Sequence, residues 1–348
     1  MHKTITFFSL LLLSFFIHAQ TVTTITDGSF SDGLAKDSQG NLYGSDWSGN
    51  TVYKLDTNGA VTVFKNGFSN PNGIGINSLD EIFICDHTAN LIRKYDTNGT
   101  LITTYSTGLT TPAGIKSIPN STDMLIVEYG TPGSSSTIKR LSTNGTITTV
   151  FTGTPLNGPA GIAYIGDTAY IANFNDRKIF KLENGILTLV AQLPNSAPNS
   201  NFLGFLSAVG NTLVATQIGE HKIYAITPST GVVSVYAGSS AGTTDGDISV
   251  ATFSSPNGIL GDTSSNQIYI SDATPKNLRI IDNALLSVNE FSLSNFEVQL
   301  FPNPTVDSLN IKINNAKVNK LNISIYDALG KRVLEKEYPV SLTEFQIK

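Results

Sequence analysis

One pattern of residues recurs six times along this 348-residue chain. Each unit opens with a glycine and a hydrophobic residue and continues to a short strand that ends in a carboxylate or amide. Two further strands and a tight turn complete the unit. The first unit shows this order, from Gly33-Leu34 through Asp46 to the turn at 56–59. A repeat of roughly 40 residues with four short strands is typical of one β-propeller blade. The sequence therefore predicts an all-β, six-bladed propeller.

Two sets of residues mark the units, and we name them anchor glycines and strand-end residues. The anchor glycines are Gly33, Gly73, Gly114, Gly161, Gly204 and Gly258. The strand-end residues are Asp46, Asp86, Glu128, Asn173, Gln217 and Asp272. Because consecutive strands of a blade run in opposite directions, both sets should lie at one end of the ring, which we call the top face. The varied loops after the strand-end residues should share this face, where binding residues usually gather.

The sixth unit lacks a clear fourth strand after residue 282. Segment 21–28 closely matches segment 146–153, the fourth strand of the third unit. We therefore expect residues 21–26 to pair beside residues 268–282 and to complete the last blade. A ring closed in this way leaves no exposed sheet edge between its first and last blades.

The N-terminus has the features of a signal peptide over residues 1–19. Lys3 precedes an apolar run at 7–17, and Ala19 is a small residue suited to cleavage. The apolar run is too short to span a bilayer, so no membrane span is expected in the mature chain. The net charge of −5 and the lack of a basic cluster argue against a nucleic-acid partner.

The stretch 236–279 closely resembles an NHL repeat. The resemblance rests on Tyr236-Ala237-Gly238, Thr244-Asp245-Gly246, Pro256-Asn257-Gly258 and Ser271-Asp272. It covers roughly residues 20–283 and implies a six-bladed propeller over that domain. The related gluconolactonase-like propellers are lactonases. The resemblance of this chain to those propellers implies a divalent metal at the channel mouth. Acidic and amide residues would hold the metal, several of them just before an anchor glycine.

The positions before the anchor glycines supply the candidate metal ligands. They are Asp32, Asn72, Ala113, Ala160, Leu203 and Asn257. The resemblance implies a weak site for a divalent cation such as calcium at Asp32, Asn72 and Asn257, on neighbouring blades. The three apolar positions depart from the lactonase pattern, and one carboxylate with two amides offers few of the oxygens that a hard cation prefers. The alternative is that Ser-Asp-Gly and Pro-Asn-Gly simply form turns.

Further candidate ligand-binding residues on the top face are Asp46, Asp86 and Asp272. Their alternative role is structural, because a carboxylate can accept hydrogen bonds from its own following loop and order that loop. Trp47 is a candidate stacking platform for a sugar or another ring, with simple packing as the alternative. The chain contains no Ser-His-Asp order, phosphate loop or Cys/His metal spacing that would indicate a catalytic residue.

The sequence therefore favours a binding or scaffold module that acts through its top face. Its ligand would be an extracellular protein or a carbohydrate. The alternatives are a metal-dependent lactone hydrolase, with a cation polarising the carbonyl and a carboxylate as base, and a propeller lyase without metal.

Composition changes after residue 283, and residues 284–295 are predicted to form a linker. Residues 296–348 strongly resemble the type A C-terminal sorting domain of type IX secretion cargo. The resemblance rests on Phe301-Pro302-Asn303-Pro304, Tyr326-Asp327 and Gly330-Lys331. It implies the type IX secretion machinery as a partner and a secreted or cell-surface location. The family pattern continues with two further strands, so we expect an incomplete, small β-sandwich.

Overall fold

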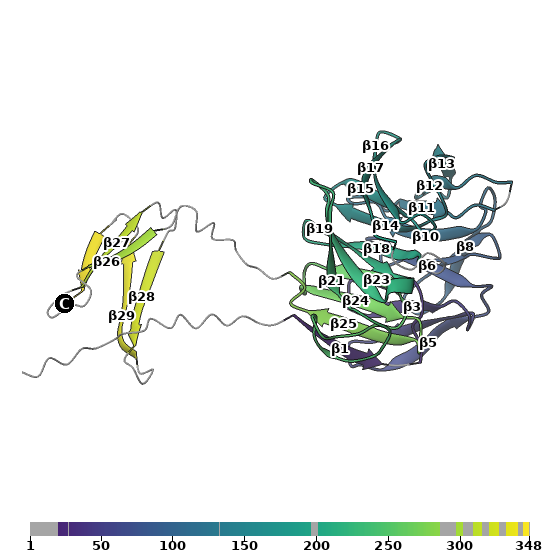
Figure 1. The fold of residues 1–348 in the computed structure, drawn as a ribbon. Helices are drawn as coiled ribbons and strands as arrows, with labels where there is room; N and C mark the ends of the chain where they lie inside the picture. The colour runs from purple at the N-terminus through teal and green to yellow at the C-terminus, as the bar shows by residue number, and fades with distance from the viewer. Residues whose placement is uncertain are drawn as a thin grey trace, which may run out of the picture. The chain divides into compact units, whose positions relative to one another are not determined.

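The computed structural model describes residues 20–26, 28–131, 133–195 and 201–285, together with five strands after residue 296. Residues 19–285 form one compact unit, and the C-terminal strands belong to a second unit (Figure 1). The predicted signal peptide, most of the predicted linker and the motif residues 302–305 and 327–331 lie outside the described residues. Within the described residues, no helix is long and apolar enough to cross a membrane.

Five blades are four-stranded antiparallel sheets whose strands follow one another in sequence. Blade one contains β2 (Leu34–Lys36), β3 (Leu42–Asp46), β4 (Thr51–Leu55) and β5 (Val61–Asn66). Blade two contains β6 (Pro71–Ile76), β7 (Ile82–Asp86), β8 (Leu91–Tyr95) and β9 (Leu101–Tyr105). Blade three contains β10 (Pro112–Ser117), β11 (Met124–Glu128), β12 (Thr137–Leu141) and β13 (Ile147–Thr152).

Blade four contains β14 (Pro159–Ile165), β15 (Thr168–Asn173), β16 (Lys178–Glu183) and β17 (Ile186–Gln192). Blade five contains β18 (Leu203–Val209), β19 (Thr212–Gln217), β20 (Lys222–Thr227) and β21 (Val232–Ala237), with a short 3-10 turn at Ile218–Glu220. The innermost strands β2, β6, β10, β14 and β18 contact one another in that order, and β23 (Pro256–Asp262) closes the ring between β18 and β2. The six-bladed fold predicted from the repeats is confirmed.

Blade six is completed by the N-terminal strand. β23, β24 (Gln267–Asp272) and β25 (Asn277–Asp282) are followed at the outer edge by β1 (Thr21–Thr26) and the short β22 (Gly246–Asp247). β1 runs antiparallel to β25, with Thr21 opposite Asp282 and Val22 opposite Ile281. Val22 is completely buried. The predicted ring closure is therefore confirmed.

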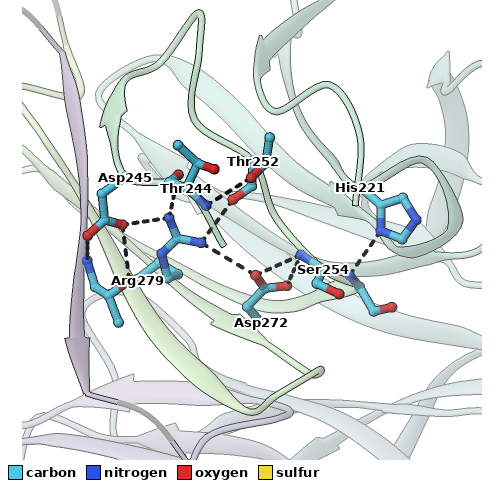
Figure 2. A network of polar contacts seen from close by, with 9 residues as sticks. His221, Thr244, Asp245, Thr252, Ser254, Asp272 and Arg279 are labelled. Carbon is cyan, nitrogen blue, oxygen red and sulfur yellow. Dashed lines mark hydrogen bonds and ion pairs between the residues drawn. The ribbon is translucent and has the colours of Figure 1, made fainter. Parts of the chain in front are cut away.

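Arg279 of β25 stabilises this closure through buried polar contacts (Figure 2). Its completely buried guanidinium donates to the carbonyl oxygens of Thr252 (2.9 Å) and Thr244 (3.0 Å) and pairs with Asp245 at 2.7 Å. Asp245 in turn accepts hydrogen bonds from the backbone N–H (2.9 Å) and the hydroxyl (3.0 Å) of Thr24 in β1. One buried cation thus connects β25, the 244–252 loop and the N-terminal strand.

The hydrophobic core lies between neighbouring blades. Between blades two and three, for example, Phe83 and Ile92 pack with Ile115 and Met124. Cys85 belongs to the same cluster and is completely buried, and this burial raises the pKa of its thiol. Side chains alternate between the two faces of each strand, and each face of a blade packs against an adjacent blade.

Close approach of the innermost strands explains the anchor glycines. A Cβ atom on Gly33 would lie 2.6 Å from the carbonyl oxygen of Asn72, and one on Gly258 would lie 1.9 Å from that of Asp32. No side chain fits at these distances, so the glycines are required by the packing of one blade against the next.

Blade five departs from the predicted register by one residue. Leu203 lies opposite Gln217 and Leu206 opposite Ala215, as Pro256 lies opposite Asp272 and Ile259 opposite Ile270 in blade six. Phe205 therefore occupies the anchor position, and Gly204 is the residue before it. The predicted register of blade five was therefore wrong by one residue. Gly204 still approaches the next blade closely, because a Cβ atom on it would lie 2.6 Å from the carbonyl oxygen of Asn257.

The C-terminal unit consists of two small antiparallel groups of strands. β26 (Glu297–Phe301), β27 (Leu309–Asn314) and β30 (Glu344–Ile347) form one sheet, with β27 in the centre. β28 (Lys320–Tyr326) and β29 (Arg332–Pro339) form a separate pair.

Candidate functional site

The strand register brings the anchor positions and the strand-end residues to the same end of every blade. The first residue of an inner strand lies opposite the strand-end residue, as with Pro71 and Asp86 or Pro112 and Glu128. Both sets of residues therefore lie at one end of the ring, the top face, together with the residues that precede the anchor positions.

One half of this central ring is polar. Asp32, Asn72 and Asn257 lie before the anchors of blades one, two and six. Hydroxyl groups of the preceding blade hold their backbone carbonyls: Ser45 donates to that of Asn72 (2.6 Å) and Ser271 to that of Asp32 (2.7 Å). Thr216 makes the same bond to the carbonyl of Asn257.

The other half of the ring is apolar. The corresponding positions before the anchors are Ala113, Ala160 and Gly204, and the positions equivalent to the hydroxyl residues are Cys85, Val127 and Ala172. The polar residues before the anchors therefore come from blades six, one and two, with supporting hydroxyls from blades five, six and one, and the apolar ones come from blades three, four and five.

Asp32 is the most perturbed group on the polar side. Its residue is only 6% exposed, and this burial raises the pKa of the carboxyl group to about 8. A hydrogen bond from the Gly33 backbone opposes the rise, the charge of Asp46 adds to it, and a hydrogen bond with the Asn257 side chain again opposes it. At neutral pH the Asp32 carboxyl is mostly protonated. Asn72 adds a buried Oδ1 that has no hydrogen-bond partner among the described residues.

The strand-end carboxylates are engaged in contacts that hold the top loops. Asp86 accepts the backbone N–H of Ser69 (2.7 Å) and pairs with Arg93 (2.8 Å). Asp272 accepts the N–H of Ser254 at 2.7 Å and faces Arg279 at 3.5 Å (Figure 2). Burial is the main cause that raises the pKa of both groups, to about 7 for Asp272.

These two carboxylates order a different loop from the one we expected. Ser69 and Ser254 belong to the segments that lead into the inner strands, not to the loops that follow Asp86 and Asp272. The reason is the register, because each strand-end side chain lies opposite the first residue of the inner strand. Asp46 pairs with Lys276 of blade six (2.8 Å), and it accepts hydrogen bonds from Ser31 (3.2 Å) and from Ser48 of its own loop (3.4 Å).

An arc of aromatic rings borders the top face, formed by Trp47, His87, Tyr129, Phe174 and Phe202. We call it the aromatic arc. Ring centroids are 5.1 Å apart from Trp47 to His87 and 6.0 Å apart from His87 to Tyr129. The arc continues at 6.0 Å to Phe174 and at 4.6 Å to Phe202, where the rings stack. All five residues are half-buried.

Trp47 was predicted from the sequence, but the other four members of the arc were not. The signal was present, because the first four members directly follow the strand-end residues of blades one to four. Burial lowers the pKa of His87, which keeps its imidazole neutral at pH 7. Its Nδ1 is buried without a hydrogen-bond partner among the described residues. Tyr129 donates a hydrogen bond to Asn175 Oδ1 at 2.8 Å.

The residues on the polar side fit a divalent cation poorly. Asp32, Asn72 and Asn257 supply one carboxyl group that is mostly protonated and two amides, where calcium takes six to eight oxygens. The nearby carboxylate of Asp46 already has a lysine partner. Within the described residues, no group of three or more His, Cys, Asp or Glu side chains is placed to hold a metal ion.

Comparison with known proteins identifies the C-terminal unit. Residues 299–348 match the family model of the secretion system C-terminal sorting domain. The search of curated proteins finds no match.

Solved structures share the propeller fold. A gluconolactonase from Xanthomonas campestris has 17% sequence identity and a TM-score of 0.58, covering 76% of this chain and 90% of that chain. An auxiliary nutrient binding protein from Bacteroides ovatus has 17% identity and a TM-score of 0.62, covering 76% of both chains. Virginiamycin B lyase from Staphylococcus aureus has 16% identity and a TM-score of 0.53, covering 76% of this chain and 99% of that chain. At these identities the likeness shows the fold alone.

The chain is thus a six-bladed β-propeller with gluconolactonase-like structural neighbours and a sorting domain at its C-terminus. The sorting domain implies engagement with the secretion machinery and indicates a secreted or cell-surface location.

Proposed function

We propose that this protein is a secreted or cell-surface binding module that holds a carbohydrate on its top face. The observation that carries the proposal is the aromatic arc, which joins half-buried rings from blades one to five. Aromatic side chains offer large, rigid, apolar surfaces, and Tyr and Trp add a polar edge. A sugar ring has the matching property, with apolar faces and hydroxyl groups around its rim.

Polar groups beside the arc could fix the orientation of such a ligand. Ser135 and Asn157 line a pocket together with Tyr129 of the arc, and their hydroxyl and amide groups suit a sugar hydroxyl. Binding sites commonly combine an apolar, aromatic lining with a few placed polar groups. The nutrient binding protein among the structural neighbours agrees with a binding role.

The sole tryptophan of the chain gives a direct test. Trp47 is a member of the arc, so its fluorescence should change in a saturable way when the full chain is titrated with oligosaccharides. Replacing Tyr129 or Phe174 with alanine should weaken the binding at least tenfold while leaving the reporter in place. Phe64→Ala, on the outer strand β5, is the matched control and should bind as the wild type does. If a broad oligosaccharide panel leaves the fluorescence unchanged, carbohydrate binding by the arc is wrong.

A metal-dependent lactone hydrolase is the second candidate, and the raised pKa of Asp32 is the observation that favours it. Strongly perturbed groups gather at functional sites. Against it, Asp46, Asp86 and Asp272 already face Lys276, Arg93 and Arg279, which leaves none of them free as a general base.

Thermal-shift titration with calcium, zinc and manganese, followed by a lactone hydrolysis assay, tests this candidate. A bound cation should raise the melting temperature of the wild type and not that of Asp32→Ala. Lactone turnover that Asp32→Ala abolishes would replace the binding proposal. Absence of both effects would exclude the hydrolase.

A further inference from the structure

The end of the propeller opposite the top face contains a cavity, which we call the bottom cavity. It has a volume of about 520 Å³, which lies within the range of small-molecule sites. Its walls come from residues 35–40 and 260–264, at the ends of the inner strands of blades one and six and in the turns that follow, and from Ile74–Ile76 of blade two. Lys116 of blade three completes it.

This bottom cavity lies at the other end of the inner strands from the aromatic arc, and the two share no lining residue. The space left inside the channel between the inner strands is only about 20 Å³. Its lining includes Phe205, the residue at the anchor position of blade five, together with Leu206 and Ile259, and Lys116 lies where this narrow space meets the bottom cavity. A ligand in the bottom cavity is therefore independent of the aromatic arc and of the function proposed for it.

The acidic groups of the bottom cavity already have partners. Asp37 accepts hydrogen bonds from the N–H groups of Gln39 (3.0 Å) and Asn41 (2.8 Å), from the Asn41 amide (2.8 Å) and from the Tyr43 hydroxyl (3.1 Å). Asp262 pairs with Lys36 at 2.7 Å. These contacts balance the charge of Lys36 and saturate both carboxylates.

Lys116 is different, because its ammonium group has no ion-pair or hydrogen-bond partner in the part of the chain that the structure describes. It is half-buried in β10, and the equivalent residues of the other blades are small, apolar or uncharged. Burial lowers the pKa of its amine, as expected for a cation drawn out of water without a counter-charge. An unpaired cation in a partly desolvated cavity is unfavourable unless an anion accompanies it.

We propose that the bottom cavity binds a small organic carboxylate, with its carboxylate group on Lys116. Thr263 is a second donor at the rim: its hydroxyl oxygen accepts the Gly210 N–H at 2.9 Å, which leaves its proton free to bond a ligand. The four charged side chains of the lining, Lys36, Lys116, Asp37 and Asp262, sum to zero. A monoanion therefore fits better than a phosphate dianion, which the two carboxylates would repel.

Isothermal titration of the full chain with D-glucuronate tests this site, with D-glucose and inorganic phosphate as the comparison ligands. Glucuronate should bind at least tenfold more tightly than either. Lys116→Met keeps the length and apolar stem of the side chain and should lose this preference, whereas Lys116→Arg keeps the charge and should retain it. Lys181→Met, at an exposed lysine on blade four, is the matched control and should bind as the wild type does.

Three results would overturn the proposal. The first is equal binding of glucuronate and glucose to the wild type, and the second is glucuronate binding that survives Lys116→Met. The third is a preference for phosphate, which would make the site one for inorganic anions. Because Tyr129→Ala changes only the aromatic arc, it should leave glucuronate binding intact, so a failure of the top-face function is distinguishable from a failure here.

Discussion

The charge of a strand-end residue is related to the side chain at one position of the following strand. Where the strand-end residue is acidic, that position is usually basic and lies beside it: Asp86 with Arg93 (2.8 Å), Glu128 with Lys139 (2.7 Å) and Asp272 with Arg279 (3.5 Å). Where it is an amide, as in Asn173 and Gln217, the position holds Phe180 or Tyr224. Blade one is the exception, since Tyr53 takes the position and Lys276 of blade six pairs with Asp46.

Removing the basic member of such a pair should be costly. Arg279→Met leaves Asp272 buried with no counter-charge, so the free energy of unfolding should fall by about 3–5 kcal/mol at pH 8. Urea denaturation measures this loss. Lys181→Met is the control, because its exposed pair with Glu183 should contribute less than about 1 kcal/mol. Equal losses in the two variants would contradict a buried role for Arg279.

Asp32 should make the protein less stable as the pH rises. Its pKa is about 8 in the folded chain and ordinarily near 3.8, so the folded state holds the proton more tightly. Between about pH 4 and pH 8 the folded state binds more protons than the unfolded state, and stability therefore falls with increasing pH. Asp32→Asn mimics the protonated form and should recover up to about 5 kcal/mol at pH 8.5 but little at pH 4. Urea midpoints at the two pH values measure this, and an unchanged pH slope would refute it.

At the scale of elements, the repeat made most of the fold predictable. Glycine spacing and alternating strands indicated six blades, and the likeness of segment 21–28 to segment 146–153 located the closing strand. The prediction for blade five was wrong by one residue, because the sequence alone does not show whether Gly204 or Phe205 occupies the anchor position. The partners of Asp86 and Asp272 also stayed hidden, since they depend on which loop the register brings near each carboxylate.

The candidate site was less predictable than the fold. Asp32, Asn72 and Asn257 could be placed at the mouth from their position before a glycine. The raised pKa of Asp32 could not be predicted, because it depends on burial by groups distant in sequence. Phe202 joins the aromatic arc from a different position than the other members, so no spacing rule would have included it.

The closing strand should contribute substantially to the stability of the whole ring. Val22→Ala removes two methyl groups from a completely buried site and should lower the free energy of unfolding by about 2 kcal/mol. Thr23→Ala, at the exposed neighbouring position of β1, should change it by less than about 0.5 kcal/mol. Thermal or urea unfolding distinguishes the two variants, and similar effects would mean that β1 packs more loosely than described.

At the scale of the whole molecule, the propeller and the sorting domain are separate units with separate tasks. The residues proposed to bind a ligand lie in the unit that spans 19–285, and the sorting match lies at 299–348. Export and ligand binding should therefore be separable by truncation.

Removal of residues 299–348 should leave the propeller folded but stop its release to the surface or the medium. Cell fractionation with immunoblotting measures the location, and the Trp47 fluorescence titration measures binding by the truncated protein. We expect the truncated chain in the periplasm with binding intact. Unimpaired surface delivery without these residues would show that another segment directs export.

The divided channel mouth has a consequence for how a ligand can lie on it. A ring of six equal blades would present six equivalent poses, and a bound molecule would be shared among them. Here hydroxyl-supported polar groups occupy one side and alanine, glycine and valine the other, so the rotational equivalence of the blades is lost at the centre. A molecule with one polar and one apolar edge would then bind in a single orientation, and its exposed end would always face the same blades.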